Sequence, residues 1–361
     1  MKKVVLLAGA RPNYMKIFPV WREIKSRDCG LEPVIVHTGQ HYDAVMSDIF
    51  FRDFGMPPPD HFLGVGSGTH AVQTAKVMMA LEPLLQEIRP ELLIVPGDVN
   101  STLAGALTAV KMGIRVAHIE AGLRSYDRTM PEEINRIATD SISDILLTSC
   151  RDADKNLLRE GIPQEKIFFV GNVMIDSLCR ILPAAGKSDV VKRLGLKSGS
   201  YFAVTLHRPS NVDNPAMLAQ IMAMLGHVAE MAPVIFPVHP RTRVMLEKHG
   251  MECSSGVTLL EPMGYVEFLA LMKSAGAVIT DSGGIQEETS FLGILCLTLR
   301  PNTERPVTIR EGTNRLLDIG ADPVGAILGR YAAREAARPA KIEGWDGHAA
   351  GRMVTALKEL I

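Results

Sequence analysis

Short apolar runs rich in Val, Ile and Leu recur along the whole chain, and each is followed by a segment of helical length. Apolar runs that are continuous rather than alternating are typical of parallel strands that helices cover on both faces. This alternation of strand and helix predicts an α/β fold with parallel sheets. The predicted strands are 3–8, 33–37, 92–96, 116–119, 145–148, 167–170, 201–206, 234–238, 257–260, 277–280 and 295–299.

The rhythm pauses once, at the polar, Gly- and Ser-containing segment 184–200, which we interpret as the approach to a second α/β domain. A chain of 361 residues, 47% of them hydrophobic, is long enough to build a core in each of two domains. Doubly wound domains bind ligands beyond the carboxyl ends of their strands. We therefore expect the ligand in a cleft between two such domains. Segment 347–361 is predicted to form a terminal helix.

The charge balance and the cysteines exclude several classes of protein. A formal net charge of -1 provides no field that would gather nucleic acid or an anionic membrane. The five cysteines are scattered and never form a C-x-x-C pair, which argues against a disulfide framework or a thiolate metal site. No apolar run reaches the roughly 18 residues that a membrane span needs. We expect a protein of the reducing cytoplasm.

The stretch TDSGGIQEE, residues 280–288, follows an apolar strand and opens a helix. Ser282, Gly283 and Gly284 would present bare backbone N–H groups at the positive end of that helix, where phosphate binds. Glu288, about one turn further on, is placed to accept from ribose hydroxyls. The structural alternative is that Asp281 or Ser282 caps an ordinary helix.

Two further strand ends carry charged residues. Arg11 and Lys16 lie at the opening of the first predicted helix, where they would suit a diphosphate or form a solvated pair. Asp98 ends another strand, with Asn100 or Ser101 free to cap the next helix. The alternative for Asp98 is a local turn through its own side chain.

Neither a metal nor a nicotinamide cofactor is expected. His37 and His41 have the spacing of a helical zinc pair, but HTGQH spans a strand end and a Gly turn. GVGSGT, residues 64–69, lacks the spacing of a dinucleotide fingerprint and is predicted to be a loop. His207 and His239 end strands, and each is open to a structural or a catalytic interpretation.

The stretch HIEAGLRSYDRTMPEEINR, residues 118–136, is crowded with carboxylates and guanidiniums. Thr129 and Glu132 are predicted to form a capping box with Pro131 as the first helical residue, and Glu133 adds negative charge at the helix start. That interpretation accounts for PEE. It leaves Glu120, at the end of an apolar strand, without a structural explanation.

Taken together, the motifs GARPNYMK, HTGQH, GDVNST, HIEAGLR, PEEINR, LHRPSNVDN, TDSGGIQEE and NTERPVT resemble the bacterial and archaeal UDP-N-acetylglucosamine 2-epimerases of the non-hydrolysing type. The resemblance covers almost the whole chain. It implies a GT-B fold of two Rossmann-like domains, 1–172 and 173–346, with helix 347–361 packing back on the first. It also implies a homodimer that uses no metal or other cofactor and has a UDP-sugar substrate.

The family pattern also assigns residues. It implies that the ribose is bound by Glu288 and that Arg136 also binds the UDP-sugar. The residues that it assigns to the phosphates are Arg11, Lys16, Ser282, Gly283, Gly284 and Arg305. It implies that the sugar is surrounded by Asp98, Glu120, Glu132 and His207, as acid/base and charge-stabilising groups.

The implied reaction interconverts UDP-GlcNAc and UDP-ManNAc, a step that supplies cell-surface polysaccharide precursors, through elimination of UDP to a 2-acetamidoglucal and its re-addition. One departure from the family pattern is that Pro209, Ser210 and Asn211 follow His207-Arg208, where many members carry an acidic residue and Asn. Another is GILC, residues 293–296, where many members have Lys-Pro. The alternatives left open are a related substrate of the UDP-diacetamido-glucuronate type, a hydrolysing epimerase that releases ManNAc, and a GT-B glycosyltransferase.

Overall fold

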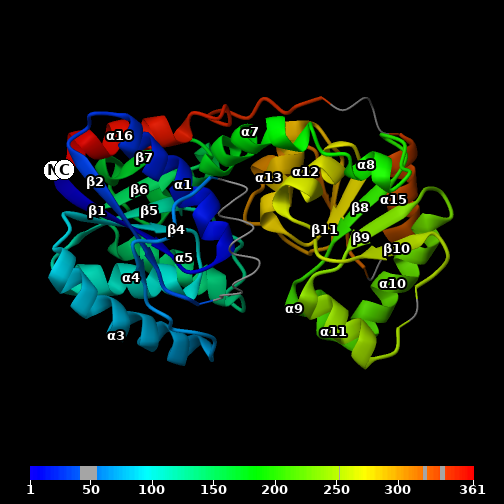
Figure 1. Ribbon diagram of the computed structural model, residues 1–361, viewed down its shortest axis with the longest axis horizontal. Helices are drawn as coiled ribbons and strands as arrows, with labels where there is room; N and C mark the ends of the chain where they lie inside the picture. The colour runs from blue at the N-terminus through cyan, green and yellow to red at the C-terminus, as the bar shows by residue number, and fades with distance from the viewer. Residues whose placement is uncertain (41–54, 252, 320–322, 334–337) are drawn as a thin grey trace. The chain divides into compact units, whose positions relative to one another are not determined.

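The computed structural model describes residues 1–40, 55–251, 253–319, 323–333 and 338–361, which form two compact units (Figure 1). The first unit comprises Met1–Arg180 with Glu343–Ile361, and the second comprises Ile181–Ile342. Each unit has its own parallel sheet, of seven strands in the first and six in the second. The predicted fold class, two Rossmann-like doubly wound parallel sheets, is therefore confirmed.

The sheet of the first unit has the strand order β3-β2-β1-β4-β5-β6-β7. This order reverses direction between β1 and β4, and ligands of doubly wound sheets bind at such a point. The strands are β1 (Lys2–Ala8), β2 (Leu31–His37), β3 (His61–Phe62), β4 (Leu92–Pro96), β5 (Arg115–Ala121), β6 (Ile145–Thr148) and β7 (Ile167–Phe169). The helices are α1 (Arg11–Ser26), α3 (His70–Ile88), α4 (Asn100–Lys111), α5 (Pro131–Ile142), α6 (Arg151–Arg159), α7 (Val173–Ala185) and α16 (Ala349–Leu360).

The sheet of the second unit has the order β10-β9-β8-β11-β12-β13, with the reversal between β8 and β11. Its strands are β8 (Phe202–Thr205), β9 (Val234–Pro237), β10 (Val257–Leu260), β11 (Ala277–Thr280), β12 (Cys296–Thr298) and β13 (Asn314–Leu316). Its helices are α8 (Val190–Arg193), α9 (Pro209–Val212), α10 (Pro215–Ala229), α11 (Pro240–Lys248), α12 (Tyr265–Lys273), α13 (Gly283–Leu292), α14 (Val307–Arg310) and α15 (Pro323–Ala332).

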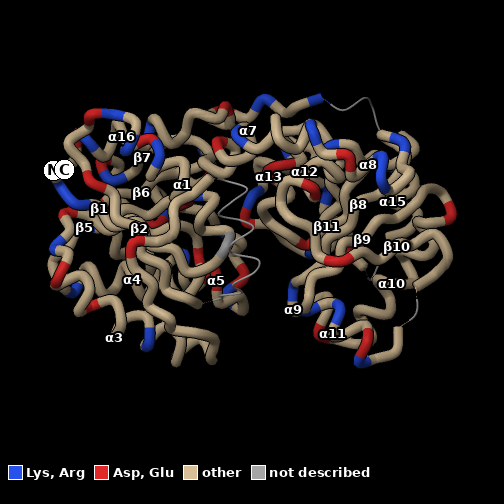
Figure 2. The backbone as a smooth tube through the Cα atoms, viewed as in Figure 1, with Lys and Arg blue, Asp and Glu red and all other residues tan. Residues whose placement is uncertain are grey.

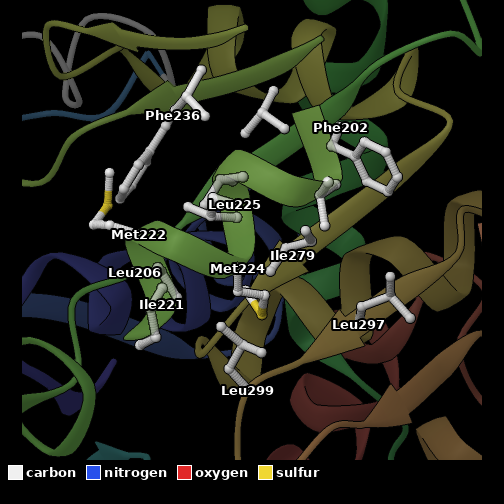
Figure 3. Close-up of a cluster of buried hydrophobic side chains, with 14 of the residues drawn as sticks. Phe202, Leu206, Ile221, Met222, Met224, Leu225, Phe236, Ile279, Leu297 and Leu299 are labelled. Carbon is white, nitrogen blue, oxygen red and sulfur yellow. The ribbon is translucent and has the colours of Figure 1, made fainter. Parts of the chain in front are cut away.

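The core of the second unit holds its strand ends in place (Figure 3). Met222 and Leu225 of α10 belong to one buried cluster with Phe236 of β9, Ile279 of β11 and Leu297 of β12. Burying a side chain of this size contributes about 1.5–3 kcal/mol. The loops that follow β8 and β11 are thereby attached to a rigid base.

The C-terminal helix belongs to the first unit, where α16 packs against α1. The backbone N–H groups of Ala349 and Ala350 donate to the Asp176 carboxylate at 3.0 and 2.8 Å. Lys2 also bonds to the carbonyl of Ile361, so the two ends of the chain lie together.

Each predicted apolar run overlaps a strand, but β3 and β13 were not predicted. Both are short, and their sequences, HF and NRL, form no apolar run, whereas the equally short β7 lies in the apolar run 167–170. Segment 184–200 contains the short helix α8. Lys and Arg alternate with Asp and Glu over both units, in agreement with a net charge of -1 (Figure 2). In the described ranges, each helix is too short or too polar to span a lipid bilayer.

Candidate active site

Most of the charged residues singled out from the sequence lie near the two reversal points. In the first unit they lie at or after the carboxyl ends of β1, β4 and the neighbouring β5, and in the second they follow β8 and β11. We describe the two groups separately.

Lys16 and Glu120 form a buried ion pair in the first unit. Asn13 anchors the start of α1, because its side chain accepts from the N–H groups of Gly9 and Ala10 and donates to Pro96 at the end of β4. One turn later, the Nζ atom of Lys16 lies 2.5 Å from Oε2 of Glu120. Lys16 is 8% exposed, so the alternative of a solvated cation does not hold.

The backbone around this pair has an unusual conformation. Glu120 adopts a φ of 67°, uncommon for a residue other than glycine, where the pairing of β5 with β6 shifts register. Gly97, after β4, also has a positive φ, and a Cβ atom there would lie 2.7 Å from the Lys16 ammonium. A side chain at position 97 would displace the ammonium from its place beside Glu120. Such strained conformations are concentrated at functional sites.

A second charged group links β4 to α5. Arg136, 2% exposed, donates to Glu133 Oε2 at 2.7 Å and also pairs with Asp98. Glu133 accepts from the N–H groups of Ser125 and Tyr126 at 3.0 and 2.9 Å. Burial alone would raise the pKa of Glu133, but these hydrogen bonds and the Arg136 charge hold the pKa below its usual value. Arg136 therefore fixes the position of Asp98, whose side chain stays 28% exposed.

Two predicted helix caps are wrong. The N-cap of α5 is Met130 and makes no side-chain bond, because the Thr129 hydroxyl donates to Asp127 instead. No capping box therefore engages Glu132, a partly exposed residue in the first turn.

At α4 the N-cap is Val99, so Asn100 and Ser101 lie inside the helix. The Ser101 hydroxyl donates to Gln40 rather than capping the helix. The Asp98 carboxylate forms an ion pair with Arg136. This ion pair takes the place of the local turn that was the structural alternative for Asp98.

Sequence reasoning missed a buried network behind the Lys16–Glu120 pair. His118 Nε2 donates to the Gly97 carbonyl at 2.7 Å, and its Nδ1 lies 2.6 Å from Asp140 Oδ1. Arg124 pairs with the other oxygen of Asp140 at 2.7 Å. Burial would raise the pKa of Asp140, but His118 and Arg124 hold it below its usual value. The network fixes the turn at Gly97. The one sign of this network in the sequence is a histidine, His118, two residues before Glu120.

In the second unit, Asp281 holds His207. Its carboxylate accepts from the backbone N–H groups of His207 and Arg208 and from the side chain of Asn211. His207 Nδ1 lies 3.2 Å from Asp281 Oδ1, while the His207 side chain is 41% exposed. Asp281 thus orients His207, and the proposal that it caps α13 is wrong. Asn211, at the departure from the family pattern, anchors this loop.

The start of α13 leaves donors for an anion. Ser282 is the N-cap and its side chain makes no capping bond. The first N–H groups of a helix have no acceptor within it, and here they belong to Gly283 and Gly284. Arg305 lies beside them, because a Cβ atom at Gly283 would be 2.6 Å from its guanidinium. Arg305 also pairs with Glu287 at 2.8 Å and with Glu304 at 2.5 Å.

Glu288 lies one turn into α13 and is 2% exposed. Its Oε1 accepts a 2.8 Å hydrogen bond from Tyr265 of α12, and its Oε2 has no hydrogen-bond partner among the described residues. Burial raises the pKa of Glu288 to about 7; the Tyr265 hydrogen bond opposes the rise and the Glu287 charge adds to it. A buried, unsatisfied carboxylate oxygen is a ready acceptor for a ligand hydroxyl.

Two residues of the sequence analysis cannot be placed. His41 and the side chain of Arg11 lie outside the described part of the protein. His37 stacks between Tyr14 and Phe62, and its Nδ1 accepts from the Gly39 N–H. Burial lowers its pKa to about 4. The described ranges contain no group of three or more His, Cys, Asp or Glu residues that could hold a metal ion.

Comparison with known proteins identifies related sequences and structures. The family model for UDP-N-acetylglucosamine 2-epimerase matches residues 22–358. A UDP-N-acetylglucosamine 2-epimerase of Methanococcus maripaludis is 42% identical, over 90% of this chain and 89% of that protein. A UDP-2,3-diacetamido-2,3-dideoxy-D-glucuronate 2-epimerase of Pseudomonas aeruginosa is also 42% identical, over 89% of this chain and 90% of that protein.

A solved structure gives the same result. The Methanocaldococcus jannaschii UDP-GlcNAc 2-epimerase, in complex with UDP-GlcNAc and UDP, is similar with a TM-score of 0.91 and 40% identity. The match covers 99% of this chain and 100% of that one, and the predicted GT-B fold class is confirmed.

Proposed function

The chain belongs to the UDP-N-acetylglucosamine 2-epimerase family, and from that premise we propose that it interconverts UDP-GlcNAc and UDP-ManNAc. One observation carries the proposal beyond family membership. The first unit gathers the Lys16–Glu120 pair and the Asp98–Arg136 pair after β1, β4 and β5, where a doubly wound sheet binds its ligand. The proton on C2 of the sugar is not acidic, so inversion at C2 needs charged side chains that can take up a proton and stabilise the charge that develops.

The chemistry that we propose is elimination followed by addition. A base removes the C2 proton, the C1–O bond breaks, and the bonding electrons leave with the UDP oxygen, which gives a 2-acetamidoglucal. UDP then adds back at C1 while an acid protonates C2 on the opposite face. The acid and base come from Asp98, Glu120, Glu132 and His207, because two faces need two groups.

We propose that the second unit binds the UDP portion. The N–H groups of Gly283 and Gly284, the Ser282 hydroxyl and the Arg305 guanidinium would hold the diphosphate, and Glu288 would accept from the ribose. The buried Oε2 of Glu288, which no described residue hydrogen-bonds, supports the ribose assignment. Arg11, Lys16 and Arg136 complete the set, and their positive charge would stabilise the departing diphosphate.

Product analysis tests the reaction. The protein is incubated with UDP-GlcNAc, without acceptor or added metal, and the products are identified by NMR. UDP-ManNAc at equilibrium with UDP-GlcNAc supports the proposal. Free ManNAc with UDP would mean a hydrolysing enzyme, and intact substrate would contradict epimerisation. UDP-2,3-diacetamido-2,3-dideoxy-glucuronate is assayed in parallel, and conversion of that sugar alone would overturn the substrate assignment.

We further propose that the protein is a homodimer and works in the cytoplasm. None of the five cysteines, all in the described ranges, forms a disulfide, which suits a reducing compartment. On the first unit, Val72 and Met79 of α3 and Ile134 of α5 are exposed, and Ile134 lines an open pocket of about 360 Å³ together with Ala71 and Met78 of α3. A second copy of the chain would cover this apolar surface.

Light scattering of the purified protein tests the dimer. Met79, 76% exposed, is replaced by Glu, and Met231 of the second unit, 46% exposed, receives the same substitution as the control. We expect Met79→Glu to lower the measured mass toward 39.3 kDa while Met231→Glu leaves it unchanged. A wild-type protein of monomeric mass would contradict the dimer.

A further inference from the structure

The second unit contains a tyrosine–carboxylate pair whose tyrosine has no function in the chemistry above. The Tyr265 hydroxyl, at the start of α12, donates to Glu288 Oε1 at 2.8 Å. Other tyrosines of this unit bond differently: Tyr201 donates to the Leu271 carbonyl and Tyr331 to the Gly199 carbonyl. Those two hydrogen bonds are to backbone carbonyls and stabilise the fold. The hydrogen bond of Tyr265 is to Glu288, the residue that we propose binds the ribose.

We propose that Tyr265 is a positioning residue for the nucleotide, which aims the Glu288 carboxylate at the ribose and favours the ionised form that the ribose requires. This inference rests on the proposed function, because it assumes that Glu288 accepts from the ribose. It adds a residue to the site and links UDP-sugar binding to the release of a proton.

The geometry supports both parts of this inference. A hydroxyl bound to Oε1 fixes the rotation of the carboxylate, so that Oε2 is held in one direction. That oxygen is buried and has no hydrogen-bond partner within the described residues. Ribose hydroxyls donate to an ionised carboxylate, which is an acceptor at both oxygens, whereas a protonated carboxyl carries a competing donor. Binding therefore selects the ionised form.

The charges around Glu288 determine how easily it ionises. From its own helix the Glu287 carboxylate opposes ionisation, and Arg305, from the segment before α14, pairs with Glu287 at 2.8 Å. From β12, the Cys296 thiol contacts Thr289 of α13. From β13 the residue that reaches the helix is the uncharged Asn314, through Gln286. Tyr265 of α12 is the group that donates directly to Glu288, and burial raises the Glu288 pKa to about 7.

The sign of the pH dependence follows. If binding requires the ionised carboxylate, affinity is full above the pKa of Glu288 in the free protein. Below that pKa affinity falls about tenfold per pH unit. Because the Tyr265 hydrogen bond favours the ionised form, its removal moves the start of this fall to higher pH. Hydrogen bonds to charged groups are strong enough for a shift of roughly one pH unit.

Calorimetry with UDP-GlcNAc tests the inference, because its doubly esterified diphosphate does not titrate near neutral pH. Dissociation constants and proton release are measured from about pH 5.5 to 8.5 for wild type, Tyr265→Phe, Glu288→Gln and the control Tyr331→Phe. We expect Tyr265→Phe to raise the midpoint of the affinity profile by roughly one pH unit and to weaken binding about tenfold below it. Tyr331→Phe should reproduce the wild-type profile.

Glu288→Gln separates the two possible failures. We expect it to weaken binding and to abolish the proton release that titrates near neutral pH. If Glu288→Gln binds like wild type, Glu288 does not contact the ribose and the proposed nucleotide site is wrong. If Glu288→Gln weakens binding while the Tyr265→Phe profile coincides with wild type, the nucleotide site stands and the positioning function of Tyr265 is overturned. Circular dichroism confirms that each variant is folded.

Discussion

Lys16 Nζ and Glu120 Oε2 lie 2.5 Å apart across 104 residues of sequence, and both side chains are buried. The pair joins α1 to the end of β5, where the pairing of β5 with β6 shifts register. Removal of one member of such a pair leaves an uncompensated buried charge, whereas removal of both is often tolerated. Stability and activity can therefore be separated here by experiment.

We expect Lys16→Met to lower the free energy of unfolding by about 3–5 kcal/mol, because the Glu120 charge loses its ammonium. Adding Glu120→Gln to this variant should restore most of the stability without restoring turnover, since the carboxylate is then absent. Urea unfolding and turnover of UDP-GlcNAc, measured on both single variants and the double variant, check this. Additive losses of stability would show that the two side chains are not coupled.

The adjacent residues Glu132 and Glu133 should behave in opposite ways. Glu133→Gln replaces a buried acceptor of two backbone N–H groups and of Arg136, so it should destabilise the protein by about 3 kcal/mol or more. Glu132→Gln should change stability by less than about 0.5 kcal/mol and lower turnover about a hundredfold or more. Normal turnover in Glu132→Gln would remove this residue from the acid/base set.

The parallel strands were predictable because a strand that is buried on both faces has a continuous run of Val, Ile and Leu. The ends of the elements were less readable. At α5, Thr129 has the expected spacing for a capping box, but its hydroxyl is taken by Asp127, which forms a local turn instead. Local competition between side chains decided the cap, and spacing alone does not reveal which competitor wins.

Long-range pairs in the site were similarly hidden. The sequence singled out Lys16 and Glu120 separately, yet nothing in it states that they pair, because the pair depends on the neighbouring positions of β1, β4 and β5. Asp281 carries no signal that separates a helix cap from an anchor of His207. Its function emerged only from the adjacency of β8 and β11.

Asp281→Asn tests that anchor. An amide has one acceptor oxygen in place of two, so either the contacts of His207 to Oδ1 or those of Arg208 and Asn211 to Oδ2 are lost, and the loop after β8 should lose its fixed position. We expect turnover to fall about a hundredfold or more, as for His207→Asn, because general acid–base catalysis depends on placement. Combining the two variants should cost little more than either alone. Independent, additive losses would show that Asp281 acts elsewhere.

Glu288→Gln should stabilise the protein at alkaline pH. The pKa of Glu288 is raised in the folded state from 4.5 to about 7, so the wild type loses stability as pH rises through this interval and keeps the penalty above it. At pH 8 the variant should be more stable by about 3 kcal/mol, and the difference should shrink toward pH 5. Thermal unfolding across this range checks the sign, with the exposed Glu247→Gln as control. A constant difference at every pH would contradict it.

Isotope exchange tests the elimination itself. If the C2 proton is removed on one face and returned on the other, solvent must supply at least part of the incoming proton, so the epimerised UDP-sugar should carry deuterium at C2 after turnover in deuterium oxide. Because the C1–O bond breaks in every cycle, an oxygen-18 label in that bridge should also scramble into the diphosphate. The 2-acetamidoglucal is held without a covalent bond, so small amounts of it and of UDP should accumulate in long incubations. NMR and mass spectrometry follow all three signals, and Glu120→Gln serves as the catalytically impaired control. Epimerisation with complete retention of the C2 hydrogen and an unscrambled bridge would rule out elimination, and with it the acid/base assignment of Asp98, Glu120, Glu132 and His207.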